Sequence, residues 1–280
     1  MEADEAFLIA VAVLLGLMFG SFATAAGHRI PRKESFLTGR SKCPNCGATI
    51  TALENIPLFS FIALRGRCRH CKARISPRYP LIEVGTGVLF GLAAWKFGFE
   101  AETVIYSAFF WVLVVLTIID LEHQLLPTRV IYPALLVGAI ALTVTALVRD
   151  DADRIIDMAI GAAIFGGIFF VIFFAAPQGG FGFGDVRLAL LLGTFVGYLG
   201  APGLVLLAMF LSFFTGALIG ITLKWWEQQG SDAEGPFRKA KVPFGPYMAL
   251  GSVISIFWGQ RLLDAYLNLF EAGPSRARAR

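Results

Sequence analysis

Charged residues are scarce in this 280-residue chain, where Asp, Glu, Lys and Arg together make up only 16% of the sequence. A soluble domain carries about a quarter charged residues, so this composition excludes an ordinary soluble globular protein. Hydrophobic residues instead make up 56% of the chain, with 26 Phe and 30 Gly. Many of them form continuous runs of about 20 residues, which is the length a helix needs to cross a bilayer. The composition therefore predicts a polytopic membrane protein.

Basic residues are absent from the start of the chain. The first apolar run, Phe7 to Ala26, is preceded by the acidic residues Glu2, Asp4 and Glu5 and by no Lys or Arg. A secretory signal peptide begins with a basic region. We therefore expect this run to be a retained first transmembrane span.

The remaining apolar runs predict an all-α polytopic fold with about eight transmembrane helices. The charged stretch 149–154 separates the fourth run from the fifth, and the Gly- and Pro-containing stretch 200–203 separates the sixth from the seventh. A small polar segment lies between the first and second spans. The predicted spans are 7–26, 81–99, 103–120, 129–148, 155–176, 186–200, 202–223 and 244–260.

Acidic residues are nearly missing from the polar segment 28–80, which carries eleven Lys/Arg but only Glu34 and Glu54. The positive-inside rule places this segment in the cytoplasm and the N-terminus outside. Threading eight spans from there puts the acidic loop 150–153 outside, in agreement with its charge. The basic residues Arg276, Arg278 and Arg280 of the C-terminal tail also fall outside, which is the one disagreement.

Cysteine is rare, and all four cysteines form two Cys-x-x-Cys pairs in this polar segment: Cys43, Cys46, Cys68 and Cys71. Two such pairs can close a tetrahedral site on one Zn²⁺. Disulfides are the alternative, which a reducing cytoplasm disfavours, and unliganded cysteines are a second one. His70 could also be a ligand, but with four thiolates present we expect it to face solvent. A closed four-sulfur site leaves no open position for catalysis, so we expect a structural zinc.

Two aspartates stand at the edges of apolar runs. Asp120 ends the run Val112 to Ile119, and Asp185 follows Gly182-Phe183-Gly184 at the start of the sixth span. Span counting places both acids on the cytoplasmic face. Two carboxylates brought close in a partly dry site share one proton, so that one activates water while the other polarises a carbonyl. The pattern predicts aspartic-protease chemistry, with Gly182 and Gly184 giving the backbone freedom beside the acid.

Each polar residue also has a structural explanation. Asp185 could be a helix cap, and Asp120 could form an ion pair with Arg129 or Arg187. Glu122 and His123 are adjacent but need not face each other, and we expect them to be interfacial residues on a polar turn. Glu83, inside the second span, could face the lipid interface or contact the basic segment, and its position in the sequence does not choose between these.

Eight stretches of the chain together resemble the bacterial type IV prepilin peptidases, which are bifunctional leader peptidase/N-methyltransferases. The resemblance covers nearly the whole chain. It lies in the following motifs: Gly20-Ser21-Phe22; His28-Arg29-Ile30-Pro31; Glu54-Asn55-Ile56-Pro57; Leu64-Arg65-Gly66-Arg67-Cys68; Ile75-Ser76-Pro77-Arg78-Tyr79-Pro80-Leu81-Ile82-Glu83; Asp120 with Leu125-Leu126-Pro127; Gly182-Phe183-Gly184-Asp185; and Val242-Pro243-Phe244-Gly245-Pro246.

The resemblance implies an aspartic endopeptidase of the bacterial inner membrane, with Asp120 and Asp185 as catalytic acids and the four cysteines as a cytoplasmic zinc site. It implies prepilin or pseudopilin precursors with short basic leaders as substrates, and S-adenosylmethionine as the donor for methylating the new N-terminus. The corresponding regions are a first span (1–27), a zinc-binding domain (28–80), a peptidase domain (81–270) and a basic tail (271–280). The chain departs from the family at Thr128, where an Asp is usual, and at Ala23-Thr24-Ala25 in place of Leu-Asn-Val.

Two other classes of protein share some of these features. A transporter would place its carboxylates near the bilayer midplane, whereas both aspartates here stand at a boundary. A non-enzymatic assembly scaffold would need the zinc domain but neither acid. Nucleic acid is not an expected partner, because the basic segment lacks a recognition motif, and anionic lipid headgroups account for its charge. The sequence has no Gly-rich nucleotide loop, so it does not locate a methyl-donor site.

Overall fold

The computed structural model describes residues 3–35, 41–51, 53–175, 182–229 and 243–271. These residues form helices, and their only β-pairing consists of two isolated bridges. The chain divides into two compact units, Met1–His123 and Gln124–Arg280. The all-α fold predicted from the sequence is confirmed. The basic tail residues 272–280 lie outside the described part of the chain.

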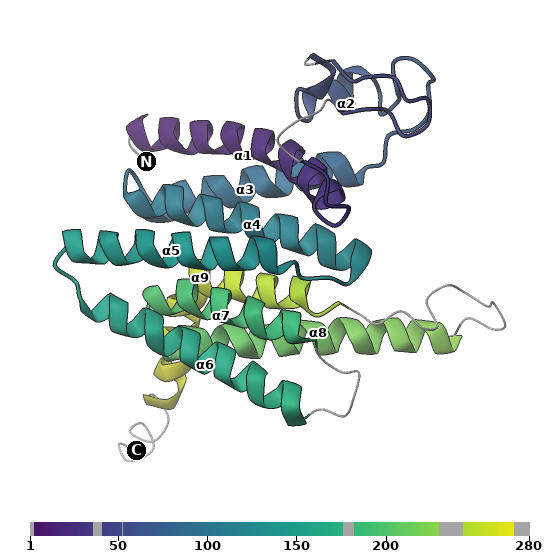
Figure 1. Cartoon of the computed structure of the whole chain (residues 1–280). Helices are drawn as coiled ribbons and strands as arrows, with labels where there is room; N and C mark the ends of the chain where they lie inside the picture. The colour runs from purple at the N-terminus through teal and green to yellow at the C-terminus, as the bar shows by residue number, and fades with distance from the viewer. Residues whose placement is uncertain (1–2, 36–40, 52, 176–181, 230–242, 272–280) are drawn as a thin grey trace, which may run out of the picture. The chain divides into compact units, whose positions relative to one another are not determined.

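The first unit is built on three long helices, α1 (Ala3–Arg29), α3 (Arg78–Phe97) and α4 (Ala101–His123) (Figure 1). A Cβ atom added to Gly16 of α1 would lie 2.7 Å from the Cα atom of Gly87 on α3. Small residues therefore let these two backbones approach closely, as is common between helices in membranes. The polar segment between α1 and α3 contains a short 3₁₀ turn, η1 (Leu53–Asn55), and a short helix, α2 (Phe59–Ala63).

The second unit contains α5 (Thr128–Val148), α6 (Asp153–Ala175), α7 (Phe183–Tyr198), α8 (Gly203–Gln229) and α9 (Gly245–Glu271). Helix α7 packs against each of the other four, and every residue from Leu191 to Tyr198 is buried. Its closest neighbour is α6, because a Cβ atom on Gly197 would lie 2.6 Å from the carbonyl oxygen of Asp157. Helix α7 is therefore the core of this unit.

The eight predicted spans all coincide with helices. Six of the described helices are long and apolar enough to cross a membrane, namely α1, α3, α4, α5, α6 and the Gly203–Thr222 part of α8. Helix α7 has only 16 residues, which fits its enclosure by other helices. Helix α9 continues to Glu271, eleven residues past the end of the predicted span, and in this polar part the side-chain amide of Gln260 donates to Asp264 at 3.1 Å. Large apolar side chains such as Val148 and Val104 face outward, as expected next to lipid.

Two glycines of α6 allow a matched test of this packing. A Cβ atom on Gly161 would press against the carbonyl oxygen of Gly193 and lie 2.6 Å from the Cα atom of Gly197, whereas one on Gly167 would meet nothing within 4 Å. Gly161→Ala should therefore destabilise the protein by about 1–3 kcal/mol through overpacking. Gly167→Ala should be neutral or stabilise it by up to about 1 kcal/mol. Unfolding in detergent micelles measures both, and equal stability of the two variants would contradict the close α6–α7 contact.

Candidate functional site

The two Cys-x-x-Cys pairs form two similar tight turns in the first unit. In the first turn the backbone N–H of Cys43 donates to the carbonyl of Ala48 at 2.9 Å, and in the second the N–H of Cys68 donates to Ala73 at 2.8 Å. The residue after each second cysteine, Gly47 or Lys72, has a positive φ, +71° and +60° respectively. Each turn thereby curls around its own pair of sulfur atoms.

The four sulfur atoms converge on one point. All lie within 4.8 Å of one another, and the Sγ atoms of Cys43 and Cys71 are 3.9 Å apart. A tetrahedral zinc with Zn–S bonds of about 2.3 Å separates its sulfurs by about 3.8 Å. A disulfide would need a separation of about 2.05 Å, and all four cysteines are free. The donor set thus fits a tetrahedral metal, and the exposed His70 is not part of it.

Local hydrogen bonds prepare some of these thiols for metal binding, because the thiolate is the form that binds metal. The backbone N–H of Ala73 and the side-chain amide of Asn45 lower the pKa of Cys71 to about 6. The backbone N–H of Ala48 also favours the thiolate of Cys46, but desolvation and the neighbouring sulfurs outweigh it and raise the pKa of Cys46 to about 11. Four thiolates in this space repel one another, and a divalent cation removes that repulsion.

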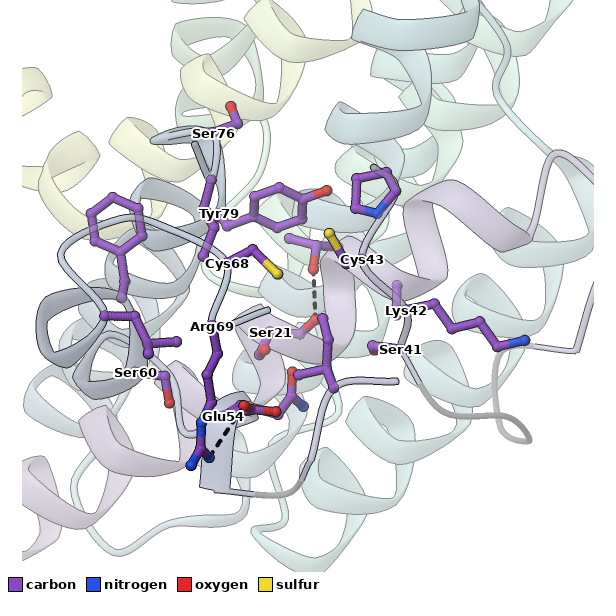
Figure 2. A pocket seen from close by; sticks show the side chains of 18 of the residues that line it. Ser21, Ser41, Lys42, Cys43, Glu54, Ser60, Cys68, Arg69, Ser76 and Tyr79 are labelled. Atoms are coloured by element: carbon purple, nitrogen blue, oxygen red, sulfur yellow. Dashed lines mark hydrogen bonds and ion pairs between the residues drawn. The ribbon is translucent and has the colours of Figure 1, made fainter. Parts of the chain in front are cut away.

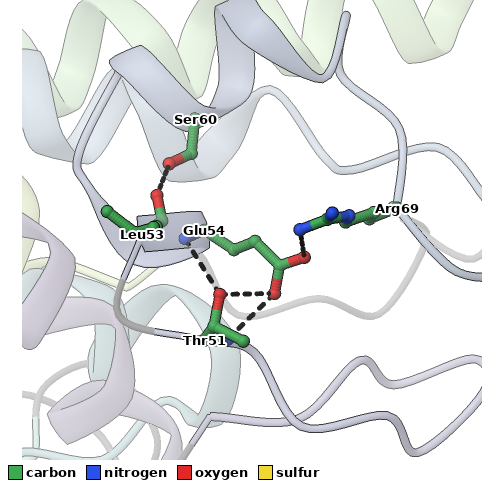
Figure 3. A network of polar contacts seen from close by, with 5 residues as sticks. All are labelled: Thr51, Leu53, Glu54, Ser60 and Arg69. Carbon is green, nitrogen blue, oxygen red and sulfur yellow. Dashed lines mark hydrogen bonds and ion pairs between the residues drawn. The ribbon is translucent and has the colours of Figure 1, made fainter.

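A carboxylate network anchors the second turn to the rest of the polar segment (Figure 3). The Glu54 carboxylate accepts hydrogen bonds from the backbone N–H and the hydroxyl of Thr51, both at 2.9 Å, and contacts the guanidinium of Arg69 at 3.5 Å. These hydrogen bonds, with the charge of Arg69, lower the pKa of Glu54. Because Arg69 lies between Cys68 and Cys71, this exposed ion pair links the second turn to η1.

Glu83 could, from its position in the sequence, face the lipid interface or contact the polar segment, and the structure shows the second. Its side chain is buried in α3, and its Oε2 atom accepts a hydrogen bond of 2.8 Å from the backbone N–H of Leu58. Leu58 has a φ of +59°, a strained conformation for a residue with a side chain. Glu83 therefore holds the polar segment onto α3, and does not face lipid.

A cavity of about 730 Å³ lies between the cysteine turns and the ends of α1 and α3. Figure 2 shows Cys43 and Cys68 among its lining side chains, together with Ser21 of α1 and Tyr79 of α3. Its volume is that of a small-molecule site. The sequence patterns did not indicate this cavity, because its walls come from three separate segments.

Asp120 lies in the last turn of α4 and is only 5% exposed. Its neighbour Glu122 points elsewhere and forms an exposed ion pair with Arg78 at 3.7 Å. His123, one turn after Asp120, has an Nε2 atom that is buried without a hydrogen-bond partner among the described residues. Asp120 is thus a buried carboxylate at the end of a candidate membrane-spanning helix.

Asp185 is the third residue of α7 and is 9% exposed. Its Oδ2 atom accepts a hydrogen bond of 3.0 Å from the backbone N–H of Gly182, the N-cap residue. Asp185 therefore does contribute to capping, as the structural alternative expected, but it does so from inside the first turn. Gly182 has a φ of −89°, which any residue can adopt. Gly184 instead provides space, since a Cβ atom there would lie 2.9 Å from the Cβ atom of Leu126.

The two acids belong to different units, Asp120 to the first and Asp185 to the second. Within its own unit each is buried in a terminal turn of a helix, Asp120 in α4 and Asp185 in α7. Arg187, a possible ion-pair partner of Asp120 by sequence, donates to the hydroxyl of Thr128 at 2.7 Å. The structure thus brings the four cysteines together and gives each aspartate a buried position of its own.

Comparisons with known proteins agree with these features. Residues 14–97 match the bacterial peptidase A24 N-terminal domain, and residues 107–221 match the type IV leader peptidase family. No solved structure matches the chain.

Relatives match over almost their whole length. The prepilin leader peptidase/N-methyltransferase of Stutzerimonas stutzeri is 32% identical over 280 residues, which cover 92% of this chain and 93% of that protein. The proteins of the same name from Aeromonas hydrophila and Bacillus subtilis are 33% and 30% identical, covering 92% and 94% of this chain and 93% and 99% of theirs. Because the identity extends over both units, the chain belongs to the type IV leader peptidase family.

Proposed function

We propose that this multi-pass membrane protein is an aspartic endopeptidase that removes the leader of prepilins and pseudopilins, and then methylates the new N-terminus. The observation that carries the peptidase part is the presence of two buried carboxylates, Asp120 and Asp185, each in a terminal turn of a helix. Relatives that span more than 90% of the chain are named prepilin leader peptidase/N-methyltransferase.

In the proposed mechanism the two acids share one proton. The ionised carboxylate takes a proton from a water molecule, whose oxygen attacks the scissile carbonyl carbon while the protonated carboxyl donates to the carbonyl oxygen. The tetrahedral intermediate then breaks its C–N bond as the amide nitrogen receives a proton. Desolvation favours this arrangement because two neighbouring carboxylates in a partly dry site do not ionise together.

The short chain connection between α4 and α5 supports the proposal that the two acids act together. Leu126, which packs against Gly184 beside Asp185, follows Asp120 by six residues. Six residues span at most about 20 Å, which is the upper limit that the chain sets on the distance from Asp120 to Leu126. The terminal positions of both acids also favour a peptidase acting at the membrane surface over a transporter, whose charged groups lie near the midplane.

The remaining parts have supporting roles in the proposal. The segment 28–80 is a cytoplasmic domain folded around one structural zinc, and its basic surface contacts anionic lipid. Because the metal is closed off by four sulfurs, it takes no part in bond cleavage. S-Adenosylmethionine supplies the methyl group, and the protein resides in the bacterial cytoplasmic membrane with both acids on the cytoplasmic side.

Replacing either acid tests the peptidase. In a reconstituted assay with a prepilin, Asp120→Asn and Asp185→Asn should each lower leader cleavage by about 10²–10⁴-fold, because an amide cannot transfer the proton. Asp264→Asn, at an exposed position, is the matched control and should cleave normally. Mass spectrometry of the product also records whether one methyl group is added. Normal cleavage by either acid variant would remove that residue from the mechanism.

Metal analysis tests the cysteine cluster. The purified protein should contain about one zinc per chain, and Cys71→Ser should lose it because three sulfurs no longer enclose the ion. His70→Ala should keep its zinc, since the imidazole lies outside the cluster. Without zinc, we expect faster proteolysis of the segment 41–76, because a structural metal contributes folding energy. A Cys71→Ser protein with undiminished zinc would refute the assignment.

A further inference from the structure

Arg187 lies two residues after Asp185 and is held by neutral groups. Its Nη1 atom donates to the hydroxyl of Thr128 at 2.7 Å, and its Cζ atom lies 4.7 Å from the ring centroid of Phe183 and 5.9 Å from that of Tyr132. Among the residues that the structure describes, no carboxylate lies within ion-pair distance of this guanidinium, and its Nε atom is buried without a hydrogen-bond partner.

These contacts join two segments that are far apart in the sequence. Thr128 and Tyr132 belong to the first turns of α5, whereas Phe183 and Arg187 belong to the first turns of α7, and these helices pack against each other (Figure 1). A second contact, Leu126 against Gly184, lies next to the first. The start of α7 is therefore attached to the 124–128 segment on both sides of Asp185.

The geometry of the guanidinium makes this attachment directional. Arginine presents its N–H groups in a rigid plane, and the Arg187 Cζ atom lies within cation–π distance of both rings while its Nη1 atom donates to the Thr128 hydroxyl. One hydrogen bond from the guanidinium to a neutral hydroxyl is weaker than a bidentate pair with a carboxylate. We therefore expect the contact to fix a position more than to stabilise the fold.

We propose that the Thr128–Arg187 contact is a positioning device, which sets the Asp185 turn against the segment that leads directly from the Asp120 end of α4. The proposal rests on the proposed function, because it assumes that both acids act on one peptide bond. Thr128 and Arg187 touch no reacting atom in this role. They hold the backbone from which Asp185 projects, and the Gly182 N–H that binds its carboxylate belongs to the same turn.

Loss of the contact should therefore affect the chemical step. Small displacements of catalytic groups can cost up to about 100-fold in rate. With the Leu126–Gly184 contact intact, we expect Thr128→Val to lower the kcat of leader cleavage about tenfold. The KM for the prepilin should not change, because the substrate's binding groups remain. Thr128→Ser keeps the hydroxyl and should restore the rate.

The experiment uses the full chain in detergent or lipid nanodiscs, with kcat, KM and Tm measured for each variant. Thr145→Val is the matched control, because the Thr145 hydroxyl bonds only to the Ala141 carbonyl of its own helix. Arg187→Lys should also lower kcat, since an ammonium cannot stack and donate in the same plane. The double variant Thr128→Val/Arg187→Lys should be no slower than the slower single variant, because both changes remove one contact.

Two results would overturn the proposal. One is a Thr128→Val enzyme with the kcat of Thr145→Val. The other is a double variant whose loss in kcat is the product of the two single losses, which would make the residues independent. Asp185→Asn, assayed in parallel, separates the two levels of inference: an inactive Asp185→Asn with a fully active Thr128→Val removes only the positioning role, whereas an active Asp185→Asn removes the proposed function and this role with it.

Discussion

The absence of water in a bilayer is the constraint on which this structure depends. Each backbone N–H and C=O within the hydrocarbon must find a partner inside its own segment, so the chain crosses as helices. Helices in lipid then associate by close packing more than by the hydrophobic effect. This explains the glycines at the α1–α3 and α6–α7 contacts, where a Cβ atom on Gly16 or Gly197 would lie less than 3 Å from neighbouring backbone. It also explains α7, a short helix whose neighbours shield it.

The polar segment between α1 and α3 has a different constraint, because it is too small to bury a hydrophobic core of its own. Domains below about 70–80 residues often need a metal or disulfides to add stability. Here four sulfurs converge on one point, the Glu54 carboxylate fixes the second turn through Arg69, and Glu83 attaches the segment to α3 through the N–H of Leu58. Polar anchors thus replace the hydrophobic core.

Burying a carboxylate within a membrane protein costs free energy, so buried Asp and Glu residues are rare there. Asp120 and Asp185 are both almost fully buried, and both stand in terminal helix turns where backbone groups and polar connections are near. The connection 124–128 follows α4 directly and packs on the first turn of α7 through Leu126 and Thr128. At the start of α5 the hydroxyl of Thr128 is the acceptor for Arg187.

The sequence by itself determined the helical fold, the positions of the eight helices and the cysteine cluster, because hydrophobic run length and Cys-x-x-Cys spacing are local properties. The predicted span 244–260 ends where hydropathy falls at Gln260, whereas the helix α9 continues to Glu271. Only the tertiary structure decided that Glu83 binds Leu58, that Gly184 makes room for Leu126, and that Arg187 donates to Thr128. Each of these joins residues at least 25 positions apart, and such contacts depend on how whole helices pack, which no local pattern records.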